Sequence, residues 1–250
     1  MNIHVVITMI GLILALVAGI WYAKKSYKIS LSVLGFGAIA FFVSSQVLEK
    51  IVHLLVLHPQ KDGTIALMKE QPLLYVLYAI LMAALFEETA RFIFFKWLEK
   101  KRSLEDQDAL AYGLGHGGLE LAYLGVASLL NLFILFSAVQ SQDPKVMQLL
   151  SEEMLQTIQS LSAWQVYLLG LERLLALAFQ VGLTVWVYQA VRRKKVFYLL
   201  AAYALHALFD LAPALSQVGW MTSPILVESI LALEVLVFIF ITKSVFWKKS

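Results

Sequence analysis

Ionisable side chains interrupt several stretches of this sequence that are otherwise almost entirely apolar. Carboxylates and imidazoles in such surroundings can activate water as general bases, hold a metal ion or pass protons along a relay. Because a charge inside an apolar span costs at least about 2.5–3.5 kcal/mol, each one needs a structural or functional reason. The residues concerned are Glu87, Glu88, Arg91, His116, Glu120, Glu172, Arg173, His206 and Asp210.

The histidines are spaced so that each shares a helix face with an acid. His116 and Glu120 are four residues apart, and so are His206 and Asp210. Residues four apart lie on one face of an α-helix. Each pair is therefore predicted to present an imidazole and a carboxylate together. A lone histidine would more often make an ordinary hydrogen bond between helices.

The two adjacent glutamates point in different directions. Glu87 and Glu88 precede Arg91 by four and three residues, and neighbouring residues of a helix lie about 100° apart around its axis. One glutamate can therefore pair with Arg91 while the other remains free to act as a general base. The alternative is a buried salt bridge that fixes helix packing.

The composition identifies the elements that must position these residues. The chain has 250 residues, of which 60% are hydrophobic and 15% charged, whereas soluble domains carry about 25% charged residues. This predicts a single membrane domain over residues 1–250. The absence of cysteine excludes disulfides, thiolate zinc sites and a cysteine nucleophile. The net charge of +3 is small and does not indicate a nucleic-acid partner.

Seven stretches are long and apolar enough to cross a bilayer as helices. They predict an all-α polytopic bundle of about seven transmembrane helices, with the ionisable residues on helices within roughly 72–215. The stretches cover roughly residues 4–23, 30–57, 72–97, 108–139, 163–191, 196–215 and 221–247.

Basic residues concentrate in alternate loops and predict the orientation. Positive charge favours the cytoplasmic side of a membrane, so the N-terminus is expected outside and the C-terminus inside. The opposite loops carry only Lys61, Lys69 and Lys145. The cytoplasmic set comprises Lys24, Lys25 and Lys28; Lys96, Lys100, Lys101 and Arg102; Arg192, Arg193, Lys194 and Lys195; and Lys243, Lys248 and Lys249.

Glu88, His116 and His206 are predicted to lie at one depth. Each is eight to eleven residues from the charged residue that marks the cytoplasmic end of its span, or roughly 12–16 Å along the helix axis. Glu120 and Asp210 lie one turn deeper. A site at this depth that hydrolyses a bond needs water, so we expect a cavity that opens to the cytoplasmic side.

An amphipathic helix is predicted in the loop between the fourth and fifth spans, at roughly 144–161. Asp143-Pro144 is typical of a helix start, and Met147 begins a stripe of apolar residues at helical spacing. We expect this helix to lie in the outer membrane interface as a connector, with a lid or substrate gate as the alternative.

The remaining ionisable residues suggest structural roles or leave the choice open. Glu172 and Arg173 either form a structural pair or hold Glu87 or Arg91. Glu228 and Glu234 are expected to give polarity to the bundle. Glu49, Lys50 and His53 are interpreted as residues that snorkel to the outer surface.

A glycine-rich run around His116 has a packing interpretation. Residues 113–118 match the Gly-x-Gly-x-x-Gly pattern, but they lie inside an apolar span rather than after a strand, so a dinucleotide site is rejected. Gly113 and Gly117 instead predict a face on which another helix packs closely.

The motifs resemble those of a known family in their order and content. They are Glu87-Glu88-x-x-Arg91, Gly113-Leu-Gly-His116-Gly-Gly-Leu-Glu120, Glu172-Arg173 and His206-x-x-x-Asp210. This set, covering roughly residues 80–215, is similar to the YhfC-type intramembrane protease family, a relative of the CAAX prenyl endoprotease and bacteriocin-processing superfamily (CPBP, or Abi) and of the PrsW proteases.

The superfamily pattern is Glu-Glu-x-x-x-Arg, Phe-x-x-x-His and His-x-x-x-Asn or His-x-x-x-Asp. Tyr112-x-x-x-His116 matches the second part with tyrosine for phenylalanine. The first motif of this chain is one residue shorter than the pattern. Alignment on the glutamates and alignment on Arg91 therefore give different catalytic candidates, and we favour Glu88 as the base with Glu87 in support.

The resemblance implies a glutamic-type peptidase that cleaves a membrane-anchored or membrane-embedded peptide or protein. In this scheme Glu88 or Glu87, assisted by His116, activates water. His206 and Asp210 stabilise the oxyanion. Arg91 orients the glutamates and Glu120 orients His116. The location it implies is the bacterial cytoplasmic membrane.

Two further questions stay open at this stage. A zinc site made by His116, Glu120 and His206 is the alternative to a mechanism without an obligatory metal or other cofactor, which we favour. A proton-coupled transporter, or a non-catalytic membrane scaffold or immunity protein, is the alternative to a peptidase. The oligomeric state is not predicted.

The topology can be tested with reporter fusions. Fusions after Lys28, Arg102 and Lys195 should all report the cytoplasm, because each follows a basic loop of the cytoplasmic set. A periplasmic signal at Arg102 would contradict the predicted orientation.

Overall fold

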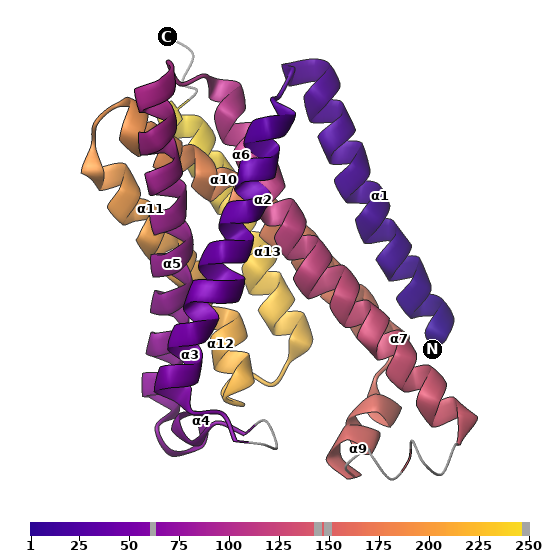
Figure 1. Cartoon of the computed structure of the whole chain (residues 1–250). Helices are drawn as coiled ribbons and strands as arrows, with labels where there is room; N and C mark the ends of the chain where they lie inside the picture. Colours follow the sequence, from indigo (N-terminus) through magenta and orange to yellow (C-terminus); the bar gives the residue numbers. More distant parts are fainter. Residues whose placement is uncertain (61–63, 143–146, 148–151, 247–250) are drawn as a thin grey trace.

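The protein is a bundle of long helices (Figure 1). The computed structural model describes residues 1–60, 64–142, 147 and 152–246. Within these ranges seven helical segments are long and apolar enough to cross a membrane, which confirms the predicted all-α, seven-span fold. They are Asn2–Tyr27, Leu31–Leu57, Pro72–Lys101, Asp106–Ser141, Ala163–Arg192, Val196–Gln217 and Pro224–Phe246.

Four of the seven spans are uninterrupted α-helices: α1 (Asn2–Tyr27), α5 (Pro72–Lys101), α10 (Ala163–Arg192) and α13 (Pro224–Phe246). The other three change their helix type or direction part-way. The second consists of α2 (Leu31–Phe41), the π-helix η1 (Phe42–Glu49) and α3 (Lys50–Leu57). The fourth consists of α6 (Asp106–Glu120), the π-helix η2 (Leu121–Val126) and α7 (Ala127–Ser141). Short π-helical stretches are rare and are frequently found at functional sites.

The sixth span breaks at Asp210, between α11 (Val196–Phe209) and α12 (Leu211–Gln217). Pro213 accounts for the position of the break. A proline has no backbone N–H, and its ring clashes with the carbonyl four residues earlier, which belongs to Phe209. Helix α11 therefore ends at Phe209, and Asp210 lies at the joint rather than inside a continuous helix.

Helix α10 is the central element of the bundle. In its most apolar stretch, 61% of the residues are buried, against 17–33% in the corresponding stretches of the other six spans. The outer helices instead expose large apolar side chains, such as Phe197, Phe240 and Leu55. These side chains suit contact with lipid, which is as apolar as the protein interior.

Glycines bring α6 very close to its neighbours. A Cβ atom on Gly37 of α2 would overlap the carbonyl group of Tyr112, and one on Gly115 would overlap the carbonyl group of Leu34. The backbones of α2 and α6 are therefore in direct contact beside His116, which only residues without side chains permit.

The predicted close-packing face of Gly113 and Gly117 is confirmed against α10. A Cβ on Gly113 would lie 2.9 Å from the Cα of Val181, and one on Gly117 would lie 3.1 Å from the Cβ of Gln180. Helix α6 is thus held between α2 and α10, and this fixes the position of His116.

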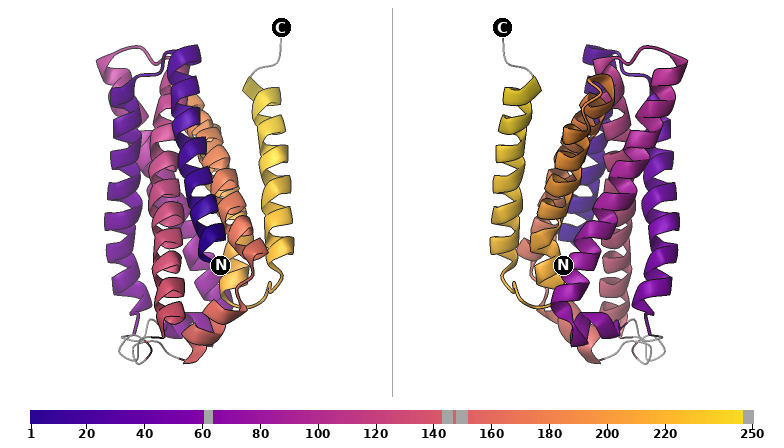
Figure 2. Two further views of the ribbon diagram at one scale, coloured as in Figure 1. Left: turned by 90° about the vertical axis from the view of Figure 1, so that its right-hand side faces the viewer. Right: turned by 90° about the vertical axis from the view of Figure 1, so that its left-hand side faces the viewer.

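The basic loops all lie at one end of the bundle, which we call the basic end. The connections α1–α2, α5–α6 and α10–α11 and the last turn of α13 are at this end (Figure 1), whereas α4 (Ala66–Glu70), α9 (Glu152–Ser160) and the N-terminus lie towards the other, the N-terminal end (Figure 2). The N-outside orientation in a membrane stays a prediction.

Helix α9 forms part of the amphipathic helix predicted at roughly 144–161. Its described segment is Glu152–Ser160, and the side chain of Ile158 is buried. The predicted start at Asp143-Pro144 lies outside the described residues.

The close packing of α2 on α6 can be tested with two glycines of one helix. Gly37→Ala should destabilise the fold by about 1–3 kcal/mol, because the new methyl group must push the backbones apart. Gly35→Ala is the matched control, since nothing lies within 4 Å of its Cβ position, and it should be neutral or stabilising by up to about 1 kcal/mol. Unfolding in detergent with increasing SDS measures both, and equal stability of the two variants would contradict the contact.

Candidate functional site

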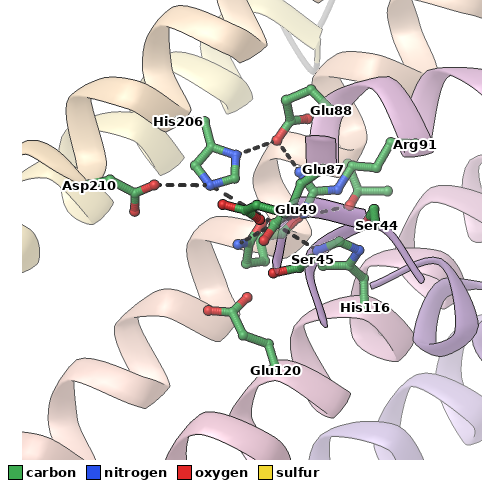
Figure 3. Close-up of polar contacts among 12 residues, drawn as sticks. Ser44, Ser45, Glu49, Glu87, Glu88, Arg91, His116, Glu120, His206 and Asp210 are labelled. Carbon is green, nitrogen blue, oxygen red and sulfur yellow. Dashed lines mark hydrogen bonds and ion pairs between the residues drawn. The ribbon is translucent and has the colours of Figure 1, made fainter. Parts of the chain in front are cut away.

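Side chains from four spans meet in the interior of the bundle and form what we call the buried cluster (Figure 3). Helix α5 supplies three of its members, α6 and α11 supply one histidine each, and α10 supplies a glutamine. The members are Glu87, Glu88, Arg91, His116, Gln180 and His206, all of which are buried.

Arg91 lies at the centre of this cluster. Its side chain is fully buried, and its guanidinium donates hydrogen bonds to Oε1 of Glu88 and Oε1 of Gln180. It also lies 3.5 Å from Oε2 of Glu87. The planar guanidinium can contact several acceptors at once, and it therefore holds both glutamates and α10 in one arrangement.

Glu87 connects the two histidines. Its Oε2 accepts a hydrogen bond from Nε2 of Gln180 at 3.1 Å and lies 2.9 Å from Nε2 of His116. The same oxygen is 3.9 Å from Nε2 of His206. One carboxylate oxygen is thus within direct or near-direct reach of imidazoles from two helices that are distant in sequence.

His206 has a defined orientation. Its Nδ1 lies 2.7 Å from Oε1 of Glu88, an oxygen that also accepts from Arg91. A carboxylate oxygen that accepts from a guanidinium acts as an acceptor for the imidazole too, so we assign the Nδ1 proton to His206. The other nitrogen, Nε2, then faces Asp210 at 3.4 Å and Glu87.

Glu120 extends the site towards the N-terminal end. Nη1 of Arg173 lies 3.9 Å from its Oε1, and Arg173 also forms an ion pair with Glu172. The sequence left open whether this pair holds Glu87 or Arg91. In the structure Arg173 contacts Glu120 instead, so the pair adjoins the buried cluster through Glu120.

Three of these residues form the donor group, a set that suits a metal ion. Glu87, His116 and Glu120 each offer one ligand atom within 4.8 Å of the others, and all three are buried. Nδ1 of His116 and Oε2 of Glu120 are also buried without a hydrogen-bond partner. The zinc set that the sequence offered as the alternative contained His206 in place of Glu87, but His206 is engaged with Glu88.

Two residues of the site were not recognised from the sequence. Gln180 contacts both Arg91 and Glu87, and its only signal is an amide inside an apolar span. Glu49 was interpreted as a snorkelling residue, which is wrong, because it is buried and lies among the site residues (Figure 3). Its position at the end of η1 became apparent only in the structure. Glu228 and Glu234 are on α13, and Glu228 lines a cavity together with Glu172.

Two comparisons with known proteins find similarity over most of the chain. The family model described as YhfC intramembrane metalloprotease matches residues 10–231. The chain is also 34% identical over 238 residues to "Uncharacterized membrane protein YhfC" of Bacillus subtilis (strain 168), with 91% of this chain and 87% of that protein covered. No solved structure matches the chain.

The central role of Arg91 can be tested through stability. Arg91→Met should destabilise the protein by about 3–5 kcal/mol, because it leaves two buried carboxylates without their cation. Lys96→Met is a control on the same helix: Lys96 pairs with Glu99 at 2.9 Å, but its side chain is 43% exposed, so its loss should cost about 1 kcal/mol or less.

Both variants are compared by SDS-titration unfolding. The double variant Glu88→Gln/Arg91→Met should recover part of the lost stability, because one of the uncompensated charges is removed. Equal losses for Arg91→Met and Lys96→Met would show that the buried cluster does not depend on the arginine.

Proposed function

Because the chain belongs to the YhfC intramembrane metalloprotease family, we propose that it is an endopeptidase that hydrolyses a peptide bond of a membrane-anchored or membrane-embedded substrate. The observation that carries this proposal is the contact of Glu87 with the imidazole of His116, 2.9 Å away inside the bundle. A carboxylate and imidazoles held together in a low-dielectric interior are the groups that activate water for hydrolysis.

The charge balance of the site supports a bound cation. Five carboxylates lie at the site, those of Glu49, Glu87, Glu88, Glu120 and Asp210, whereas Arg91 is its fully buried cation. Arg173 is already paired with Glu172. Unpaired buried carboxylates are costly, so either protons or a metal ion must neutralise the excess.

The donor group fits a divalent metal such as zinc. Two carboxylates and one imidazole are ligands that zinc accepts, and three protein ligands are typical of catalytic zinc sites. We propose that Glu87, His116 and Glu120 would hold the ion. A divalent metal bound there would polarise a water molecule or the substrate carbonyl.

The remaining groups have roles that follow from their contacts. Arg91 and Gln180 fix the carboxylate of Glu87. Glu88 holds the Nδ1 proton of His206, so that Nε2 faces the reacting region with Asp210 beside it. His206 can then accept a proton at Nε2 and release it to a leaving amine, while Asp210 stabilises the protonated imidazole.

The contacts favour Glu87 over Glu88 for the direct role, although the sequence favoured Glu88. Glu88 has a fully buried side chain and is engaged with Arg91 and His206. Glu87 contacts His116 and belongs to the donor group. We therefore propose that Glu87 acts on the reacting atoms and that Glu88 positions His206.

A metal-free glutamic mechanism uses the same residues and is the rival proposal. In it Glu87, assisted by His116, takes the proton of water directly, as the proposed kinship with the CAAX-protease (CPBP) and PrsW families implies. The donor group and the word metalloprotease in the family description move our preference to the metal.

The proposed setting is a single membrane domain in the bacterial cytoplasmic membrane. The seven apolar spans support membrane insertion, and the basic loops support the N-outside orientation. A peptidase inside a bilayer would act on membrane substrates, so a peptide with an apolar anchor is the appropriate probe.

Metal content and activity together test the proposal. The purified protein should retain a stoichiometric divalent metal, measured by mass spectrometry, and cleave membrane-anchored peptides in detergent or liposomes. Glu87→Gln should weaken metal binding, because Glu87 belongs to the donor group, and should slow cleavage by at least about 100-fold. His116→Ala and Glu120→Gln should lose both the metal and the activity.

The matched control is Glu228→Gln, which removes a buried carboxylate outside the donor group and should keep the metal and the activity. Full activity of the protein after chelation and dialysis would contradict the proposed metal requirement and favour the glutamic mechanism. Unchanged cleavage by Glu87→Gln would overturn the assigned site.

A further inference from the structure

We propose that water and the substrate polypeptide reach the site from the N-terminal end of the bundle, through a cavity beside Glu172 and Arg173. The substrate part of this inference rests on the proposed function, but the water part does not. It differs from the sequence-based expectation of a cavity that opens at the basic, cytoplasmic end.

Exposure increases from the centre of the site towards the N-terminal end. The side chains of Arg91, Glu88 and His116 are 0% exposed. Those of Glu120 and Arg173, which lie further from the basic end along α6 and α10, are 11% and 21% exposed. The site therefore opens in one direction, towards the end that carries the N-terminus.

Asp210 follows the same trend on a third helix. It lies at the far end of α11 from the basic loop that precedes this helix, and its side chain is 32% exposed, whereas that of His206, one turn nearer the basic end, is 3% exposed. Helices α6, α10 and α11 thus agree on the direction of the opening.

Aromatic side chains fill the bundle on the other side of the site. Tyr112 lies one turn from His116 towards the basic end and is fully buried. Its ring centroid is 4.8 Å from that of Phe94 and 5.3 Å from that of Phe95, and Phe95 in turn packs on Tyr188 at 5.6 Å. These four rings from α5, α6 and α10 form a continuous layer between the site and the basic end.

Two cavities in the half of the bundle nearer the N-terminal end share Glu172. One of about 340 Å³ is lined by Glu172, Arg173, Ser128 and leucines of α7, η2 and α10. The other, of about 350 Å³, lies towards α12 and α13 and also contacts Glu228. The guanidinium of Arg173 joins the first cavity to the site, because its Nη1 lies 3.9 Å from Glu120 of the donor group.

A larger cavity at the basic end does not provide an equivalent route. It has about 540 Å³ and is lined by residues that include Asp106, Leu110 and Val181. Asp106 accepts a hydrogen bond from Tyr188 of the aromatic layer at 2.9 Å. The packing of Gly113 on the backbone of Val181 also closes the contact between α6 and α10 there.

The chemistry of the cavity beside Arg173 suits an apolar polypeptide segment. Leucines make up half of the residues that line it, and the Glu172–Arg173 pair is its charged feature. Apolar side chains of a substrate would contact the leucines. The guanidinium of Arg173, which neighbours Glu120, would donate hydrogen bonds to a backbone carbonyl or carboxylate oxygen of the substrate.

Cysteine labelling can test this route without any measurement of activity. The chain contains no cysteine, so single cysteines give unambiguous signals with a membrane-impermeant thiol reagent. Ser128→Cys reports the proposed cavity, and Ser45→Cys reports the site itself (Figure 3). Gln107→Cys reports the cavity at the basic end, and Gln60→Cys marks the compartment at the N-terminal end.

The four variants are compared in sealed vesicles of both orientations. Ser128→Cys and Ser45→Cys should react from the same side as Gln60→Cys, and Gln107→Cys only from the opposite side. Labelling of Ser45→Cys only from the Gln107 side, or from neither side, would overturn the proposed route. If the cysteines react from the expected sides but the protein cleaves no substrate, the route is supported and the peptidase function is contradicted. The two failures can therefore be told apart.

Discussion

The arrangement of the whole site depends on one buried cation. The guanidinium of Arg91 contacts Glu88, Glu87 and Gln180, and Glu88 in turn orients His206. In a low-dielectric interior a charged group without partners is too costly to persist, so these contacts must form together. Helices α5, α10 and α11 are therefore fixed to one another by the same hydrogen bonds that orient the candidate catalytic groups.

The irregular helices of the fold make this cluster geometrically feasible. Three of the seven spans contain a π-helical stretch or a break, and each irregularity adjoins a site carboxylate: Glu49 ends η1, Glu120 precedes η2 and Asp210 lies between α11 and α12. A regular helix directs its side chains at fixed intervals, whereas a π-helix or a proline break changes their direction. The irregularities thus turn carboxylates towards a common centre that straight helices would not provide.

The close contacts at glycines have a different purpose. They hold α6 against α2 and α10, which removes free volume on two sides of His116. Together with the aromatic layer, this packing leaves the N-terminal end as the more open direction. A hydrolytic site inside a membrane needs access for water at a defined side, and a rigid, closed opposite end supplies that asymmetry.

The sequence by itself determined the class of the protein and its seven spans, and it singled out most residues of the candidate site. Apolar length defines a membrane helix without reference to the rest of the fold, and ionisable residues such as Glu87, His116 and His206 are conspicuous because they are costly in lipid. Only the tertiary structure decided which glutamate contacts which histidine, that Gln180 joins the cluster, and that Glu49 is buried there. These outcomes depend on helix rotation, on π-helical shifts and on contacts between distant segments, and a one-dimensional pattern does not record the relative rotation of packed helices.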